Sequence, residues 1–157
     1  MFILRITIFA VLPLLFINRS YSSSINLSRK KRFLSFIYPG TKWCGMGNEA
    51  KSYGDLGTNV EADKCCRAHD NCKEYIPAYD SIGGTRNDLP YTVSHCDCDS
   101  TFYRCLKEAN TKTAKKIGEI YFNTLKVPCF VWQKEDCHEG GCQQERKAVL
   151  QLPRQFR

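Results

Sequence analysis

A histidine and an aspartate stand side by side between cysteines in the run Cys65-Cys66-Arg67-Ala68-His69-Asp70-Asn71-Cys72. In a helix, Cys65, His69 and Cys72 fall at i, i+4 and i+7, on one face. The two cysteines then bracket the histidine and could anchor its helix against another element. A histidine held rigidly beside a carboxylate is what general-base chemistry or metal-assisted hydrolysis requires. The run therefore predicts a catalytic site.

Cys98 and Cys105 are seven residues apart, as Cys65 and Cys72 are. This matched spacing predicts a second helix that packs against the one carrying His69. Two antiparallel helices would place the pairs at matched heights, and the bridges would be Cys65–Cys105 and Cys72–Cys98. His69 would then lie level with position 101, and Asp99 would be roughly 3 Å away along the axis. Such a carboxylate would fix the tautomer of His69 and stabilise its imidazolium. Since no serine or thiol is obviously free to attack, the predicted nucleophile is water.

The glycine-rich segment Trp43-Cys44-Gly45-Met46-Gly47 predicts a cation site. Its alternate carbonyls, those of Trp43, Gly45 and Gly47, can curl toward one point because glycine imposes no Cβ restriction. Calcium accepts several backbone oxygens together with a carboxylate and waters. Asp70 could supply that carboxylate if Cys44 pairs with Cys66. Calcium there would polarise an ester carbonyl, and the N–H of Gly45 could help to hold the oxyanion.

Each feature also has a simpler interpretation. Gly-x-Gly is common in turns, and a His-Asp dipeptide is more often part of a solvated helix surface. The cysteines with nearby histidines could bind zinc, although a secretory context favours disulfides. The apolar cluster at residues 33–38 is equally compatible with a core and with an exposed patch that contacts lipid. The occurrence of loop, helix and partner helix together favours the catalytic interpretation.

The N-terminal region predicts an exported protein. Arg5 precedes an apolar stretch at residues 6–17, which is too short to span a bilayer, and small polar residues follow it. We expect a signal peptide at residues 1–22, a propeptide at 23–32 that ends in the basic run Arg29-Lys30-Lys31-Arg32, and a mature domain at 33–157. Ten cysteines in 157 residues then indicate a disulfide framework.

Removal of the first 32 residues changes the meaning of the net charge. The whole chain has 23 basic and 16 acidic residues, and six of the basic residues but none of the acidic ones precede residue 33. The mature part is nearly neutral, which argues against a nucleic acid partner and against bulk attraction to anionic membranes. We expect secretion, with no obligate protein partner.

The predicted elements position these residues in a mainly α fold. Residues 33–57 read as a loop, and the capping-box pattern at 58–61 opens a helix that ends near Tyr75. A long irregular connection at 76–93 follows. A second cap at 94–97 opens a helix to about Asn110, and an amphipathic stretch with Ile117, Ile120 and Tyr121 extends to about Leu125. Residues 129–132 predict a strand, 137–142 a small loop, and 149–157 a weakly specified tail.

These motifs together resemble those of group III, or bee-venom type, secreted phospholipase A2. The matching stretches span residues 38–123 and are Tyr38-Pro39-Gly40-Thr41-Lys42-Trp43-Cys44-Gly45-Met46-Gly47-Asn48, Cys65-Cys66-Arg67-Ala68-His69-Asp70, Ser94-His95-Cys96-Asp97-Cys98-Asp99, Phe102-Tyr103 and Tyr121-Phe122-Asn123. The resemblance implies two long antiparallel disulfide-linked helices, a calcium loop, a small disulfide-rich C-terminal region and calcium-dependent hydrolysis of the sn-2 ester of glycerophospholipids at a membrane or micelle surface.

The same resemblance implies the role of each site residue. Calcium would be bound by the carbonyls of Trp43, Gly45 and Gly47 and by the Asp70 carboxylate. His69 would activate water, Asp99 would support it, and Tyr121 would hydrogen-bond Asp99. The implied bridges are Cys44–Cys66, Cys65–Cys105, Cys72–Cys98, Cys96–Cys129 and Cys137–Cys142.

Two other classes of function remain alternatives to the enzyme. One is a non-catalytic toxin or receptor ligand on the same scaffold, since inactive relatives commonly lose the histidine or the aspartate that this chain retains. The other is a disulfide-rich structural or inhibitor domain, which has no reason to place these residues in compatible positions. The resemblance fades beyond Cys142, where Arg146-Lys147 would permit cleavage into two chains.

Overall fold

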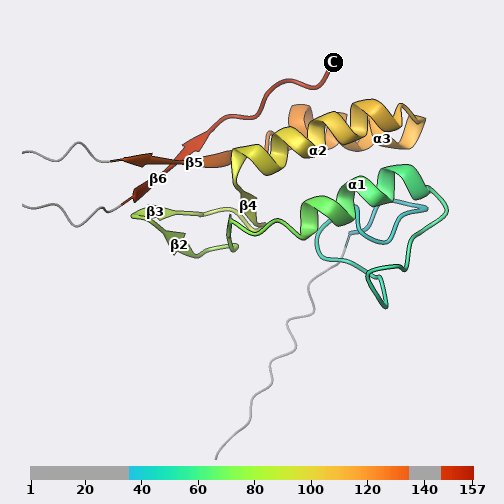
Figure 1. Cartoon of the computed structure of the whole chain (residues 1–157), viewed down its shortest axis with the longest axis horizontal. Helices are drawn as coiled ribbons and strands as arrows, with labels where there is room; N and C mark the ends of the chain where they lie inside the picture. Colours follow the sequence, from blue (N-terminus) through green and yellow to red (C-terminus); the bar gives the residue numbers. More distant parts are fainter. Residues whose placement is uncertain (1–35, 135–145) are drawn as a thin grey trace, which may run out of the picture. The chain divides into compact units, whose positions relative to one another are not determined.

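Two antiparallel helices form the frame of the structure. The computed structural model describes residues 36–134 and 146–157. Helix α1 (Val60–Asp70) and helix α2 (Cys96–Ala109) lie side by side (Figure 1). The disulfides Cys65–Cys105 and Cys72–Cys98 join them at two levels, and the order of the cysteines shows that the helices run in opposite directions. The cysteine spacing predicted this pairing.

The first helix is shorter than its sequence predicts, and its predicted extension to Tyr75 is wrong. Helix α1 ends at Asp70, and the side-chain amide of Asn71 donates to the Arg67 carbonyl at 2.7 Å. The chain then leaves the helix axis because Cys72 is bridged to α2 and strand β1 (Tyr75–Ile76) pairs with strand β4 (Val93–Ser94).

The start of α1 also differs from the prediction. Asn59 occupies the N-cap position without a capping hydrogen bond from its side chain, so the capping box predicted at 58–61 is wrong. Its amide instead donates to the Pro39 carbonyl at 3.2 Å, which ties the helix start to the preceding loop. Tertiary contact has replaced the local cap.

The second helix begins and ends close to the predicted positions. The cap is His95 rather than Ser94, because the His95 ring nitrogen Nδ1 accepts from the Asp97 N–H at 3.3 Å. At the other end Asn110 adopts the left-handed conformation, with φ of 47°, that commonly terminates helices.

The third helical stretch consists of two kinds of helix. Helix α3 (Lys112–Gly118) starts at Thr111, whose hydroxyl accepts from the Ala114 N–H at 3.1 Å. It continues directly into the π-helix η1 (Glu119–Thr124). Single π turns inside helices are rare and frequently occur at functional sites. Here the π turn carries Tyr121.

The remaining regular elements of the described chain are short strands. Strand β2 (Ser81–Ile82) pairs with β3 (Thr85–Arg86) inside the connection predicted to be irregular, and β5 (Cys129–Lys134) pairs with β6 (Arg146–Gln151). The predicted strand at 129–132 is thus confirmed, whereas β6 overlaps the predicted tail. The predicted mainly α class therefore holds for the part of the fold that carries the site, and short strands make up the other regular elements. The predicted loop and bridge Cys137–Cys142 lie outside the described residues.

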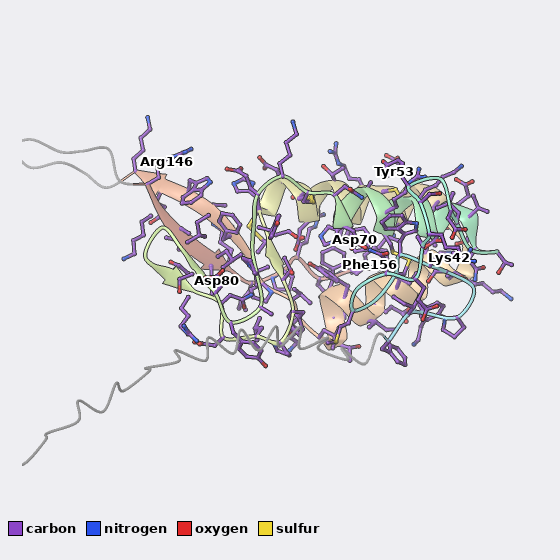
Figure 2. All side chains as sticks on the ribbon, turned by 90° about the horizontal axis from the view of Figure 1, so that it is seen from below. Lys42, Tyr53, Asp70, Asp80, Arg146 and Phe156 are labelled. Atoms are coloured by element: carbon purple, nitrogen blue, oxygen red, sulfur yellow. A yellow bond between two sulfur atoms is a disulfide. The ribbon has the colours of Figure 1, made fainter. Side chains whose placement is uncertain are left out.

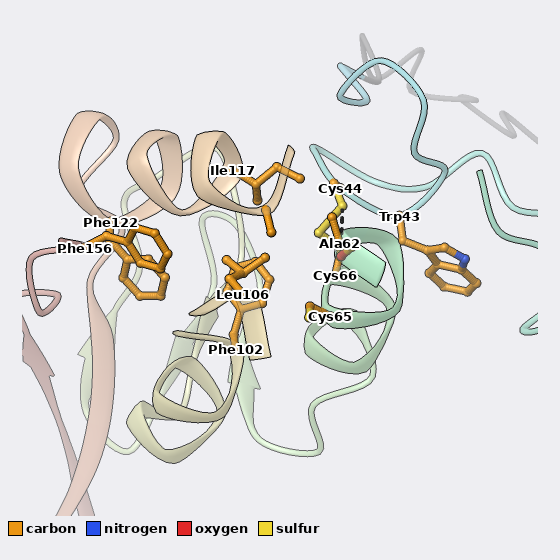
Figure 3. Close-up of a cluster of buried hydrophobic side chains, with 11 residues drawn as sticks. Trp43, Cys44, Ala62, Cys65, Cys66, Phe102, Leu106, Ile117, Phe122 and Phe156 are labelled. Atoms are coloured by element: carbon orange, nitrogen blue, oxygen red, sulfur yellow. Dashed lines mark hydrogen bonds between the residues drawn. A yellow bond between two sulfur atoms is a disulfide. The ribbon is translucent and has the colours of Figure 1, made fainter. Parts of the chain in front are cut away.

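The buried side chains form two clusters. One lies between the helices and includes Phe102, Leu106, Ile117, Phe122 and Phe156 (Figure 3). The other is formed by residues of strands β1, β4, β5 and β6 and includes Phe130 and Ile76. Figure 2 shows Lys42 and Tyr53 near the helices and Arg146 at the hairpin end. Within the part of the chain that is described, no helix has the length and apolar character needed to cross a membrane.

Candidate active site

A histidine and an aspartate from the two antiparallel helices meet in a direct contact. His69, in the last turn of α1, places its ring nitrogen Nε2 2.7 Å from Oδ1 of Asp99 in the first turn of α2. The side chains are 12% and 6% exposed. The His69 ring also stacks on Phe102, with ring centroids 4.4 Å apart. Packing and hydrogen bonding therefore both fix the orientation of the imidazole.

A tyrosine holds the aspartate from the opposite side. The Tyr121 hydroxyl lies 3.2 and 3.3 Å from the two carboxylate oxygens of Asp99. Burial, and then the neighbouring Asp99 charge, raise the pKa of Tyr121 well above its usual value. The phenol therefore stays protonated and donates. Among the described residues the Asp99 carboxylate has two partners, His69 and Tyr121, and it is almost completely buried.

The glycine-rich loop is bound to the same helix. The disulfide Cys44–Cys66 joins it to α1. The N–H of Tyr38 donates to the Cys44 carbonyl at 2.7 Å, and the N–H of Glu49 donates to the Lys42 carbonyl at 2.8 Å. Among the residues that the structure describes, no donor is bonded to the carbonyls of Trp43, Gly45 or Gly47. Alternate carbonyl oxygens of the loop are thus available to a cation, which is the donor set that calcium uses.

The two glycines of the loop have separate reasons to lack a side chain. Gly47 has a φ of 77°, which is the left-handed region that favours glycine. Gly45 lies opposite Ile37 in an isolated bridge, and a Cβ there would collide with the Phe36 carbonyl. In the described chain the N–H of Gly45 donates to no acceptor, so it is available to an oxyanion.

Sequence reasoning missed Asp63, the residue that holds the loop in place. Its carboxylate is fully buried and accepts from the backbone N–H groups of Lys42, Trp43 and Gly57 at 2.7 to 3.0 Å. A signal was present in the sequence, because Asp63, Cys66 and Asp70 stand at i, i+3 and i+7 and share one face of α1. That face is the one to which the loop is bridged.

Replacement of Asp63 with alanine should destabilise the protein by about 3 kcal/mol, because the backbone N–H groups it satisfies would lose their acceptor in a buried place. Asp63→Asn retains one acceptor oxygen and should cost less. The free energy of unfolding, measured by denaturant titration, checks both. Asp88→Ala is the matched control, since its ion pair with Arg86 is exposed and should change stability little. A loss for Asp63→Ala as small as that of the control would contradict the assignment.

The loop, His69 and Asp70 line a common pocket. Its volume is about 690 Å³, within the usual range for small-ligand sites. The rest of the lining is largely apolar and includes Phe36, Phe102, Ile117, Ile120, Tyr121, Leu125 and Val127. An apolar pocket with a base and a carboxylate at one place in its wall can hold a hydrocarbon chain and do chemistry on its polar end.

Asp70 is exposed to solvent at the pocket, yet the surrounding protein changes its acidity. Burial of the carboxylate among neighbouring groups, and then the charge of Asp63, raise its pKa to about 7. Solvent access screens part of this effect, so the cost to folding is smaller than the pKa alone suggests. A carboxylate that is reluctant to ionise without a counter-charge is well suited to a cation ligand.

The disulfides of the described chain are four, and they are the pairs that the resemblance implied for these cysteines. Besides the three already described, Cys96–Cys129 joins the start of α2 to strand β5. None of the eight cysteines in the described residues is free, which leaves no thiolate there for the zinc interpretation. The framework fixes the loop, both helices and the strands to each other.

Comparison with known proteins gives a consistent result. A family model described as phospholipase A2 matches residues 37–133. The chain is 51% identical over 109 residues to phospholipase A2 isozymes PA3A/PA3B/PA5 of Heloderma suspectum, covering 69% of this chain and 73% of that protein. It is 42% identical over 95 residues to phospholipase A2 of Apis mellifera, covering 60% of this chain and 57% of that protein.

A human relative is a much longer protein than this chain. The human group 3 secretory phospholipase A2 is 38% identical over 119 residues, which cover 73% of this chain but only 23% of that protein. The residues that the family model matches, 37–133, include the loop, both bridged helices and the π turn.

Proposed function

Since this chain belongs to the phospholipase A2 family and is an enzyme of that type, we propose that it is a secreted, calcium-dependent hydrolase of the sn-2 acyl ester of glycerophospholipids. Its products would be a fatty acid and a lysophospholipid. The observation that carries the proposal is the buried His69–Asp99 contact in the wall of a pocket shared with Asp70 and the glycine-rich loop.

The geometry supports His69 as the general base. A neutral imidazole that donates Nε2–H to Asp99 has its lone pair on Nδ1, which is the nitrogen left to accept a proton from water. The water oxygen attacks the ester carbonyl carbon as its proton passes to Nδ1. Asp99 stabilises the resulting imidazolium, and Tyr121 holds Asp99 in place. The imidazolium then returns the proton to the leaving alkoxide of the lysophospholipid.

The donor set of the loop supports a calcium site. Trp43, Gly45 and Gly47 would contribute carbonyl oxygens, and Asp70 would contribute a carboxylate. Calcium bound there would polarise the ester carbonyl and offset the charge of the oxyanion. The N–H of Gly45, which has no acceptor among the described residues, would add a hydrogen bond to that oxyanion.

The surroundings of the pocket support a membrane or micelle surface as the partner. Phe36, Leu125 and Tyr75 line the pocket and are 71%, 51% and 49% exposed. Within the apolar cluster predicted at 33–38, Phe36 thus favours the lipid-contact alternative over the core. Secretion is supported by the disulfides, which persist in oxidising compartments. The proposed mature domain begins at Phe33, after the basic run.

Fatty-acid release from mixed phospholipid vesicles, with calcium and with excess chelator, tests the proposal. We expect release only with calcium, and positional analysis of the products should find the sn-2 acid. Release of equal rate in chelator would overturn the calcium dependence, and loss of the sn-1 acid would overturn the position.

Calcium affinity should depend on pH because Asp70 holds a proton below a pH of about 7. Calcium needs the carboxylate, so binding must displace that proton. Between pH 8 and pH 6 the calcium Kd should rise roughly tenfold, as expected for a single group of this pKa. Without calcium the sign for stability is opposite to that of an ion-paired aspartate: the folded chain retains a proton that the unfolded chain releases, so stability falls from about pH 4 to pH 7.

Calorimetric titration with calcium at the two pH values measures the effect. His69 lines the same pocket, so His69→Gln is titrated beside the wild type and should retain the pH dependence. Asp70→Asn should bind more weakly and lose the dependence. A wild-type Kd that is equal at pH 6 and pH 8 would show that Asp70 does not exchange a proton for calcium.

A further inference from the structure

The C-terminal segment, residues 152–157, packs against the helix that carries Tyr121. Its anchor is Phe156, which is only 6% exposed although it is the next-to-last residue of the described chain. The Phe156 ring stacks on Phe122 with the planes 8° apart (Figure 3). It also meets Tyr103 edge-on at a centroid distance of 4.9 Å. Any side chain at Gly118 would collide with this ring. The ring is therefore seated directly on the backbone of α3.

Polar contacts hold the same segment in register. The side-chain amide of Asn123 donates to the Phe156 carbonyl at 2.7 Å, and the Phe156 N–H donates to Oδ1 of Asn123 at 2.8 Å. The Lys107 ammonium donates to the Arg157 carbonyl, and the Arg154 guanidinium lies 5.1 Å from the Tyr103 ring centroid. Because the Asn123 side chain bonds both the N–H and the carbonyl of Phe156, it fixes the position of Phe156 along the π turn as well as adding stability.

The residue that binds the backbone of Phe156, Asn123, belongs to the π turn of the active site. Asn123 lies two residues after Tyr121 in η1, and Tyr121 donates to Asp99. Because π turns are rare and frequently occur at functional sites, contacts that hold this turn bear on the site that it carries. The segment at 152–157 contacts the turn through Phe156, which packs on Phe122 and is hydrogen-bonded to Asn123.

A second path leads from the segment to His69 through stacked rings. Phe156 contacts Phe122, the Phe122 centroid lies 5.9 Å from that of Phe102, and Phe102 stacks on His69 at 4.4 Å. Displacement of Phe156 would loosen Phe122, and through it the ring against which the base is held. Both paths end at the His69–Asp99–Tyr121 group.

We propose that Phe156 and Asn123 are positioning residues of the active site, which the C-terminal segment completes by fixing the π turn and hence the Tyr121 hydroxyl. This inference rests on the proposed roles of His69, Asp99 and Tyr121. Neither residue lines the pocket. A small shift of a positioned group is enough to lower a rate by an order of magnitude or more.

The test compares kcat and KM of the full chain on a short-chain phospholipid below its micelle concentration, at saturating calcium. We expect Phe156→Ala to lower kcat about tenfold with KM changed less than about twofold. Phe156→Leu, which keeps apolar volume, should recover most of the rate. Leu152→Ala is the matched control, because this side chain of the same segment is 85% exposed, and it should behave as wild type.

A double-mutant cycle separates positioning from mere stability. If Phe156 acts through the Tyr121 hydroxyl, Phe156→Ala should cost less than about twofold more in a Tyr121→Phe background, because the hydroxyl is already absent. Full additivity, or an unchanged kcat for Phe156→Ala, would overturn the inference. If Phe156→Ala does not fold, Asn123→Ala, which keeps the ring, decides the same question in the same cycle. His69→Gln runs in parallel: activity equal to wild type there would overturn the proposed mechanism instead.

Discussion

Replacement of His69 with glutamine should lower the rate of sn-2 fatty-acid release by about 10³-fold, within the usual contribution of a positioned general base. Glutamine has similar reach and can still hydrogen-bond Asp99, but it cannot take a proton from water. The loss should appear in kcat, while calcium affinity and vesicle partitioning stay near wild type. Measurement of release and partitioning on the same vesicle preparation checks this.

His95→Gln is the matched control for that substitution. His95 caps α2 and its ring lies edge-on to Phe130, and it does not line the pocket. We expect near wild-type turnover from it, with at most the small loss of stability that a weakened cap causes. Equal release by wild type and His69→Gln would refute the general-base role. No release from folded, calcium-loaded wild type would favour the non-catalytic toxin or receptor ligand on the same scaffold.

Much of the site could be predicted because its residues sit on regular elements with matched cysteine spacings. A disulfide between antiparallel helices fixes height along the axis, so the level of His69 determined that Asp99 should face it. The 2.7 Å contact between the two follows from that spacing. The loop was predicted for a weaker reason, since the glycines at 45 and 47 permit such a turn without requiring it, and in the structure Gly47 has a φ of 77°.

The remaining features depend on contacts between segments distant in sequence, which local patterns do not encode. Helix α1 stops at Asp70 because Cys72 and strand β1 take the chain elsewhere, although the sequence has no proline or glycine at that point to end the helix. The π turn requires support from Phe156, 35 residues after Tyr121 in the numbering. The spacing of Asp63 places it on the face of α1 to which the loop is bridged, but its three backbone partners lie in the segment before the helix and cannot be read from that spacing.

Asp70→Lys should abolish calcium binding and lower fatty-acid release about 10³-fold or more, because the loss of a bound Lewis acid removes several kcal/mol of transition-state stabilisation. The lysine would place an ammonium where the cation should sit. The side chain is exposed at the pocket, so the four described disulfides and the helical circular dichroism should be retained. Calcium titration and fatty-acid release, measured on one preparation, check both effects.

Asp88→Lys makes the same change of charge at a surface position whose only described partner is the exposed Arg86, and it should match wild type in both measurements. This control separates loss of the ligand from a general change in attraction to vesicles. Wild type in excess chelator should fall to the level of Asp70→Lys, and magnesium should not restore it, because backbone carbonyls with a single carboxylate suit calcium's loose coordination better than magnesium's tight octahedron. Full hydrolysis by Asp70→Lys, or by wild type in chelator, would contradict the proposed calcium site between the loop and Asp70.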